Sequence, residues 1–268
     1  MAQLETLLVS SPHDHIRVVS LNRPKQMNAY STRMCEALCA EIDAYLKDDA
    51  LRVLVLTGEG RAFCAGGDVS NADDDRDHLM AQQLSHGREM RDGMHRVIQA
   101  LHHLDKPVIA AINGAAVAGG LALALACDMR IADESAKLGD TSGRFALLPD
   151  EGGAWLFPRA MGLDRALRMT LLAETYPARE AQALGLVTEV VPDGTALEAA
   201  LDLATRLAAQ SPLAVRLAKA MMVQGLDMTL EQSQREAALS VMIANESDDV
   251  KEGVRAFFKK QTPHFTGH

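Results

Sequence analysis

Residues 108–127 read VIAAINGAAVAGGLALALAC, an apolar run long enough to cross a membrane. Its composition indicates a different structure, because the run consists mainly of Ala and Gly. The pairs Asn113-Gly114 and Gly119-Gly120 divide it into a strand, a turn and a buried helix. We therefore interpret it as the centre of a folded domain and not as a membrane span.

The segments around this run alternate between strand and helix patterns. LRVLVLTG (51–58) is almost continuously apolar, which is typical of a strand buried on both faces of a parallel sheet. The predicted strands are 16–22, 51–58, 106–113, 129–133 and 186–191, with helices at about 34–47 and 79–104 and an acidic loop, NADDDRD, at 71–77. This alternation predicts an α/β fold. After Pro192 the pattern is wholly helical, with segments starting near 196, 212, 229 and 248, and is typical of a packing layer or an oligomer interface.

Composition and charge narrow the classes of function. The chain has 268 residues with 48% hydrophobic and 24% charged side chains, as in ordinary globular proteins, and its formal net charge of −9 argues against a nucleic-acid surface. Residues 1–10 lack the basic start and apolar core of a secretory signal. The cysteines form no CxxC pair, so we expect reduced thiols and a cytoplasmic protein; they are Cys35, Cys39, Cys64 and Cys127.

Two glycine-rich turns carry the first chemical signal. FCAGGD (63–68) follows the predicted buried strand 51–58, and AGGLALALACD (118–128) places a glycine pair before an apolar helix. Glycines let the backbone approach a ligand, and the first N–H groups of a helix have no partner within it. One amide from each turn would make an oxyanion hole. The alternative is that these glycines only permit close packing.

Together the two turns resemble the crotonase superfamily, the enoyl-CoA hydratase/isomerase family, and most closely its phenylacetate-pathway isomerase branch. The resemblance covers almost the whole chain. Its motifs are LNRPKQMNAYS (21–31), TGEGRAFCAGGD (57–68), KPVIAAINGAAVAGGLALALACD (106–128), LLPDEGGAWLFPRAMG (147–162) and EGVRAFFKKQTPHF (252–265). It implies a spiral of β-β-α units over 1–195, followed by a helical trimerisation region over 196–268.

The resemblance also implies a binding mode for an acyl-CoA thioester. The amides of Gly67 and Gly119 would hold the enolate oxygen. Cations and aromatic faces suit phosphates and an adenine ring. The expected CoA contacts are Arg23, Lys25 and the carbonyl of Ala65, with Phe257 and Lys260 coming from a neighbouring subunit of a trimer or a dimer of trimers.

Two departures from the family pattern bear on the reaction. Hydratases of the family use two glutamates to add water across a double bond. Those positions are occupied here by Ala122 and Ser142, neither of which can act as a carboxylate base. The position of Ser142 depends on the alignment, so Asp140 stays in reserve.

Carboxylates occur instead at Asp150 and Glu151, between Pro149 and a glycine pair. A desolvated carboxylate beside a thioester can have a raised pKa and transfer a proton. In isomerase branches of the family, an acid at one of these positions does so. We favour Glu151 as the base, with Asp150 as its partner or substitute. The alternative for Asp150 is capping of the helix that follows.

These observations predict isomerisation of an unsaturated acyl-CoA, which needs no metal or redox cofactor and involves neither nucleic acid nor membrane. Several histidines lie in the predicted helix 79–104, but no matching ligand set accompanies them. Hydration is the chemical alternative. A non-catalytic acyl-CoA binding protein, with the oxyanion turns and without the two glutamates, is the alternative of a different class.

Overall fold

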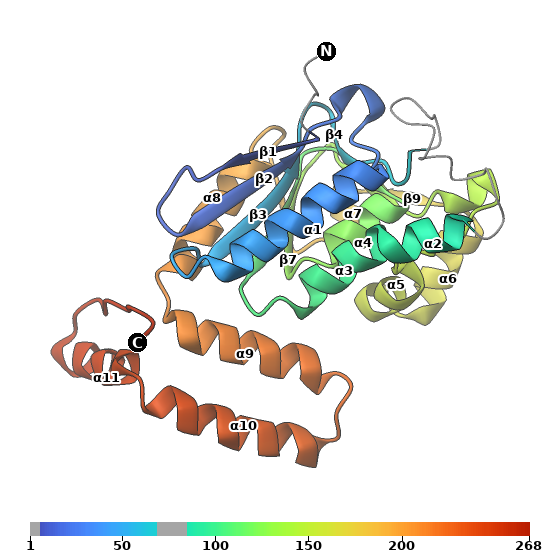
Figure 1. Cartoon of the computed structure of the whole chain (residues 1–268). Coiled ribbons are helices and arrows are strands. Elements are labelled where there is room, and N and C mark those ends of the chain that lie inside the picture. Colours follow the sequence, from blue (N-terminus) through green and yellow to red (C-terminus); the bar gives the residue numbers. More distant parts are fainter. Residues whose placement is uncertain (1–5, 69–84) are drawn as a thin grey trace.

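The computed structural model describes residues 6–68 and 85–268 and contains two sheets (Figure 1). The larger has the strand order β1-β2-β3-β5-β7-β10 and the smaller β4-β6-β8-β9. The strands are β1 (Leu7–Ser10), β2 (Ile16–Leu21), β3 (Val53–Gly58), β4 (Ala62–Cys64), β5 (Val108–Ile112), β6 (Ala115–Val117), β7 (Met129–Asp133), β8 (Lys137–Gly139), β9 (Thr175–Pro177) and β10 (Glu189–Val191). The sheets run parallel except for β1 and β9.

The chain alternates between the two sheets as a spiral. Along the chain, β3 is followed by β4, β5 by β6 and β7 by β8. The first strand of each pair lies in the large sheet and the second in the small one, and helices connect successive pairs. The helices are α1 (Thr32–Lys47), α2 (Ser85–Asp92), α3 (Met94–His103), α4 (Gly119–Leu125), α5 (Gly153–Met161), α6 (Leu163–Leu171) and α7 (Ala178–Ala183). The α/β fold with repeated β-β-α units that the sequence predicts is confirmed.

The strand β3 shows why a continuous apolar run is needed at this position. Leu54 and Leu56 point into the main core, whereas Val53 and Val55 point to the other face of the sheet and pack against α8 (Ala196–Ala208). Alternate side chains of a strand point to opposite faces. Both faces are therefore buried, as the pattern of 51–58 predicts.

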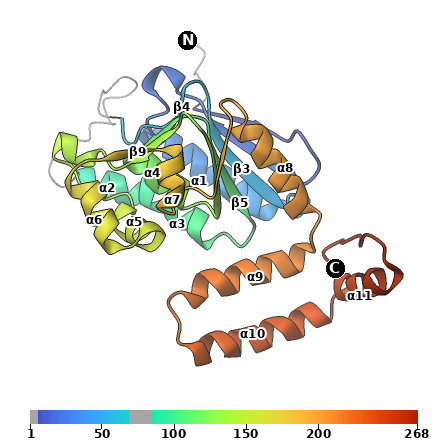
Figure 2. The same ribbon diagram turned by 180° about the vertical axis from the view of Figure 1, so that it is seen from behind.

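The helix α8 belongs to this layered core. Its buried face is a row of alanines with a spacing of four residues, which brings the helix close to β3, β5 and β7; they are Ala196, Ala200, Ala204 and Ala208. Figure 2 shows α8 lying on the sheet. The sequence pattern predicts one C-terminal helical region over 196–268 that includes this segment, but the part that projects begins only with α9.

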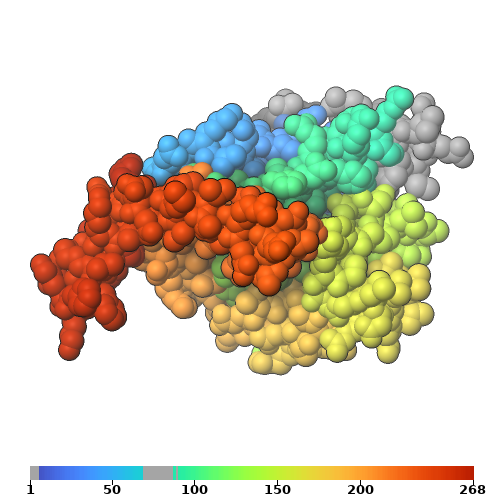
Figure 3. Space-filling model, turned by 90° about the horizontal axis from the view of Figure 1, so that it is seen from below, coloured from blue at the N-terminus to red at the C-terminus, as the bar shows by residue number. Residues whose placement is uncertain are grey.

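The projecting part consists of α9 (Pro212–Gly225), α10 (Leu230–Asn245) and α11 (Asp248–Lys259). Neither α9 nor α10 contains a buried residue. From below, the C-terminal segment extends beyond the edge of the core (Figure 3). Its exposed large apolar side chains include Met222, Leu226, Leu239, Met242, Ile243, Phe257 and Phe258.

Differences from the predicted elements have local causes. The predicted helix 79–104 is divided into α2 and α3 at Gly93, whose backbone is not helical. The acidic loop 71–77 and the start of that predicted helix lie outside the described residues. The run 108–127 forms β5, β6 and α4, as its glycines predict. In the described part of the chain, no helix has the length and apolar character needed for a membrane crossing.

Candidate active site

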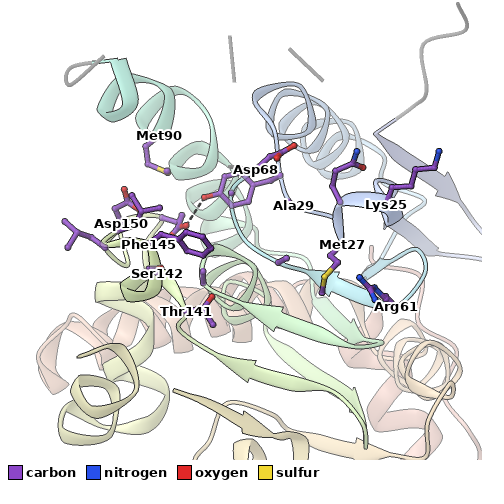
Figure 4. A pocket seen from close by; sticks show the side chains of 18 residues that line it. Lys25, Met27, Ala29, Arg61, Asp68, Met90, Thr141, Ser142, Phe145 and Asp150 are labelled. Atoms are coloured by element: carbon purple, nitrogen blue, oxygen red, sulfur yellow. Dashed lines mark hydrogen bonds between the residues drawn. The ribbon is translucent and has the colours of Figure 1, made fainter. Parts of the chain in front are cut away.

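A cavity of about 430 Å³ opens where the two glycine-rich turns meet. It is lined by residues from four separate parts of the sequence: 25–30, 61–68, Ala118, and 141–151, together with Met90. In Figure 4, Lys25 and Arg61 lie at one end, and Ser142, Phe145 and Asp150 lie at the other. The cavity is therefore elongated, with cations at one end and a carboxylate group at the other.

The first turn is held by hydrogen bonds to the segment before α1. The amide of Tyr30 donates to the carbonyl of Gly66 (2.8 Å), and the amide of Asp68 donates to the carbonyl of Tyr30 (3.0 Å). Because the carbonyl and amide of one trans peptide point in opposite directions, the Gly67 N–H points away from Tyr30. Gly67 lines the cavity.

The second turn brings Gly119 to the start of α4. Its preceding residue, Ala118, has φ 51° and ψ −127°, an unusual backbone conformation for a residue with a side chain. Gly119 N lies within 3.5 Å of the place where a Cβ on Gly66 would stand, so the two turns are in contact. Within the described residues, neither the Gly67 nor the Gly119 amide donates a hydrogen bond to a backbone carbonyl.

The carboxylate of Glu151 lies directly against Gly119. An added Cβ on Gly119 would stand 2.5 Å from Oε1 of Glu151 and 2.7 Å from the ring of Tyr30. The Tyr30 hydroxyl donates to the same Oε1 at 2.8 Å. The other oxygen, Oε2, is buried and has no hydrogen-bond partner among the described residues.

Burial raises the pKa of the Glu151 carboxyl to about 7. The hydrogen bond from Tyr30 acts in the opposite direction, and the charges of Asp150 and Asp140 add to the increase. Burial and the neighbouring Glu151 raise the pKa of Tyr30 well above its usual value, so its phenol stays neutral and donates. A carboxyl that titrates near neutral pH is suited to both removing and returning a proton.

Asp150 occupies a different environment from Glu151. Its side chain is half-buried and lines the cavity, while its carbonyl accepts a hydrogen bond from Nε2 of His95 at 2.7 Å. The helix α5 begins after Gly152, with no side-chain cap. The N-cap position of α5 is therefore held by Gly152 and not by Asp150.

At the two positions where the family resemblance predicts the glutamates of hydratases, this chain has no carboxylate. Ala122 is fully buried in α4, and Ser142 lines the cavity wall. Asp140 is buried behind that wall, where its Oδ1 accepts a hydrogen bond from the Ser142 amide at 3.0 Å. Over residues 6–68 and 85–268, no cluster of His, Cys, Asp and Glu side chains is arranged to hold a metal ion.

The predicted CoA contacts have different environments. Lys25 is exposed and lines the cavity together with Ala65. Arg23, in contrast, is buried, pairs with Asp68 at 2.6 Å and donates to the carbonyl of Ala29. Its guanidinium thus joins the first turn to the segment before α1, a geometry that does not favour the expected contact with CoA.

Phe257 and Lys260 lie at the C-terminal end of α11 and are not among the residues that line this cavity. The helix α11 projects away from the two sheets (Figure 1). A contact with CoA would therefore need a second copy of the chain. Sequence reasoning did not assign a role to Tyr30 or Arg61, although both lie within quoted motifs. Arg61 is exposed and lines the same end of the cavity as Lys25.

The sequence model of the enoyl-CoA hydratase/isomerase family matches residues 12–268. The chain belongs to this family. Among its relatives, the 1,2-epoxyphenylacetyl-CoA isomerase of Escherichia coli is 35% identical, with 97% of this chain and 98% of that protein covered. The 2,3-dehydroadipyl-CoA hydratase of the same organism is 33% identical, with the same coverage of both chains. The crystal structure of an enoyl-CoA hydratase from Bacillus anthracis superposes with a TM-score of 0.92 at 34% identity, covering 98% of this chain and all of that one.

Family membership establishes an enzyme of the enoyl-CoA hydratase/isomerase type, a class that acts on acyl-CoA thioesters. Hydratases and isomerases both occur among its relatives. The choice between the two reactions therefore depends on the acid and base groups in the cavity.

Proposed function

We propose that this enzyme moves a double bond of an enoyl-CoA from the β,γ to the α,β position, with Glu151 as the single proton carrier. The observation that carries the proposal is the placement of one desolvated carboxylate against Gly119, with a free oxygen and a pKa of about 7. Isomerisation needs one group that takes a proton and returns it elsewhere.

In the proposed reaction, Oε2 of ionised Glu151 removes a proton from the carbon beside the thioester carbonyl. The electrons of that C–H bond move toward the carbonyl oxygen, giving a dienolate whose negative charge is stabilised by the amides of Gly67 and Gly119. The protonated Glu151 then returns the proton to the carbon two positions further along. The charge on oxygen is lost as the conjugated double bond forms, and Glu151 is again ionised.

The rest of the substrate would extend in two directions from this centre. At one end, Lys25 and Arg61 offer cations to the phosphates of CoA, and Ala65 of the first glycine-rich turn lines the same cavity. On the other side of Glu151 lies a second cavity of about 350 Å³, whose lining includes Ile98, Trp155 and Leu156. Its apolar walls suit the acyl part of the substrate.

We also propose that three copies of the chain, or two such trimers, assemble through the projecting helices. The apolar side chains of α9, α10 and α11 are unusually exposed for a single chain, and Phe257 lies among them. In the assembly, Phe257 and Lys260 of one copy would reach the CoA bound by another. A stable monomer in light scattering at micromolar concentration would contradict this assembly and the shared CoA site.

The competing reaction, hydration, requires one group to deprotonate water and another to protonate the adjacent carbon. With Ala122 and Ser142 at the usual positions, the carboxylates that line the cavity with Glu151 are Asp150 and Asp68, and Asp68 is paired with Arg23. The third candidate is a protein that binds acyl-CoA without turnover. Binding alone does not require a carboxyl such as that of Glu151, whose pKa is about 7.

One comparison tests these functions against each other. Wild type, Glu151→Gln and Asp150→Asn are each assayed for β,γ to α,β isomerisation and for hydration of the conjugated thioester, using short, long and aromatic enoyl-CoA substrates. Isomerisation should dominate in wild type and fall by two to four powers of ten, roughly, in Glu151→Gln. Fast hydration that survives both substitutions would refute the proposal, and tight binding without turnover would favour the binding protein.

A further inference from the structure

We infer that Tyr30 is a positioning residue for the base. Its hydroxyl donates a hydrogen bond to one carboxylate oxygen of Glu151, so that the other oxygen is the one that exchanges a proton with the substrate. This inference rests on the proposed function of Glu151.

The two carboxylate oxygens have clearly different surroundings. Oε1 accepts the Tyr30 hydroxyl at 2.8 Å, whereas Oε2 is buried without a partner among the described residues. Both side chains are only 6% exposed, so water competes poorly for the bond. A carboxylate held at one oxygen cannot rotate freely, and its orphaned oxygen keeps a constant direction.

The backbone of Tyr30 is attached to the oxyanion turn at the same time. Its amide donates to Gly66 and its carbonyl accepts from Asp68, on either side of Gly67. Its ring packs against Gly119, the position of the other predicted donor. Tyr30 therefore connects both oxyanion turns to the base.

The same bond favours the ionised form of Glu151, because the phenol donates its hydrogen bond to the charged carboxylate and so lowers the pKa of Glu151. The groups that oppose ionisation are the carboxylates Asp150 and Asp140, which act in addition to burial. The Cys64 thiol also faces this site, and burial raises its pKa to about 12, so it stays neutral. Removing the Tyr30 hydroxyl should therefore move the titration of Glu151 to higher pH.

The test compares Tyr30→Phe with Tyr45→Phe. Tyr45 is a matched control, since it is fully buried in α1 and its hydroxyl donates to the Pro107 carbonyl at 3.4 Å, in the core. In Tyr30→Phe, the acid limb of the pH profile of kcat/KM for isomerisation should move upward by about one to two pH units, as expected for a lost hydrogen bond to a charged group. At pH 6, kcat of Tyr30→Phe should fall by about tenfold or more, and KM should change by less than about twofold. Tyr45→Phe should keep the wild-type profile.

A second comparison separates this inference from the proposed function. If Tyr30 acts through Glu151, adding Tyr30→Phe to Glu151→Gln should lower the residual rate no further. An unmoved acid limb in folded Tyr30→Phe, or additive losses in the double variant, would overturn the role of Tyr30 while leaving Glu151 as the base. Full activity in Glu151→Gln would instead overturn the proposed function. Circular dichroism and thermal unfolding of each variant distinguish these results from loss of folding.

Discussion

Replacing Gly119 by alanine tests how closely the carboxylate of Glu151 packs against the start of α4. The new methyl group would stand 2.5 Å from Oε1 of Glu151 and 2.7 Å from Cε1 of Tyr30, whereas ordinary contact begins at 3.4 Å. The carboxylate oxygen must therefore retreat by the difference between 3.4 and 2.5 Å, about 0.9 Å. Alanine keeps the backbone N–H, so the predicted oxyanion donor is retained and only the base and its tyrosine are displaced.

A displacement of about 1 Å in a catalytic group costs roughly a hundredfold in rate. We therefore expect kcat of Gly119→Ala for β,γ to α,β isomerisation to fall about a hundredfold, with KM changed by no more than about threefold. Overpacking of this kind also destabilises a core by about 1–3 kcal/mol, so thermal unfolding should occur at a lower temperature. Steady-state kinetics at pH 8, where Glu151 is mostly ionised, measures the loss without interference from its titration.

The control is Gly143→Ala, because a methyl group there meets nothing closer than 3.5 Å. It should retain wild-type kcat and stability. Folded Gly119→Ala with wild-type kcat would refute the argument, since it would mean that the position of Glu151 relative to Gly119 is not critical for the reaction. An equal loss in Gly143→Ala would show that the effect is not specific to the base.

Further predictions follow from burial and charge. For wild type, kcat/KM should rise with pH through an acid limb near 7, because Glu151 must lose its proton to act as the base, and a profile flat from pH 5 to 9 would contradict this. The folded state holds this proton more tightly than the unfolded chain, whose pKa is near 4.5, so stability is lost as pH rises from 4.5 to 7. The free energy of unfolding, measured in urea, should therefore be higher for Glu151→Gln than for wild type by up to about 3 kcal/mol at pH 8, and the two should be equal at pH 4. Lys25→Ala and Arg61→Ala should each raise KM for a CoA thioester by roughly two- to fivefold, and equal effects on a pantetheine thioester, which lacks the nucleotide, would exclude a phosphate contact. Arg23→Met removes the buried ion pair with Asp68 and should lower the free energy of unfolding by about 3–5 kcal/mol, whereas a change below 1 kcal/mol or so would show that the pair is dispensable.

The local pattern of the sequence determined most of the fold. Continuous apolar runs predict strands covered on both faces, and the glycine pairs divide 108–127 correctly, because side-chain periodicity and backbone freedom act over a few residues. The same reasoning, with the family resemblance, predicts an oxyanion amide in each glycine-rich turn and predicts that Ala122 and Ser142 stand where hydratases of the family have glutamates. These conclusions depend only on which residues are present and on their spacing.

Contacts between distant segments were decided only by the tertiary structure. The hydrogen bond between Tyr30 and Glu151 joins residues 121 positions apart, and no local pattern predicts it. Asp150 and Glu151 are neighbours with the same chemistry, yet they differ in burial, because successive side chains on a turn point in different directions. Arg23 looks like a surface cation in the sequence until packing buries it beside Asp68. The charge and pKa of each group depend on the neighbours that folding brings to it, and those neighbours come from remote parts of the chain.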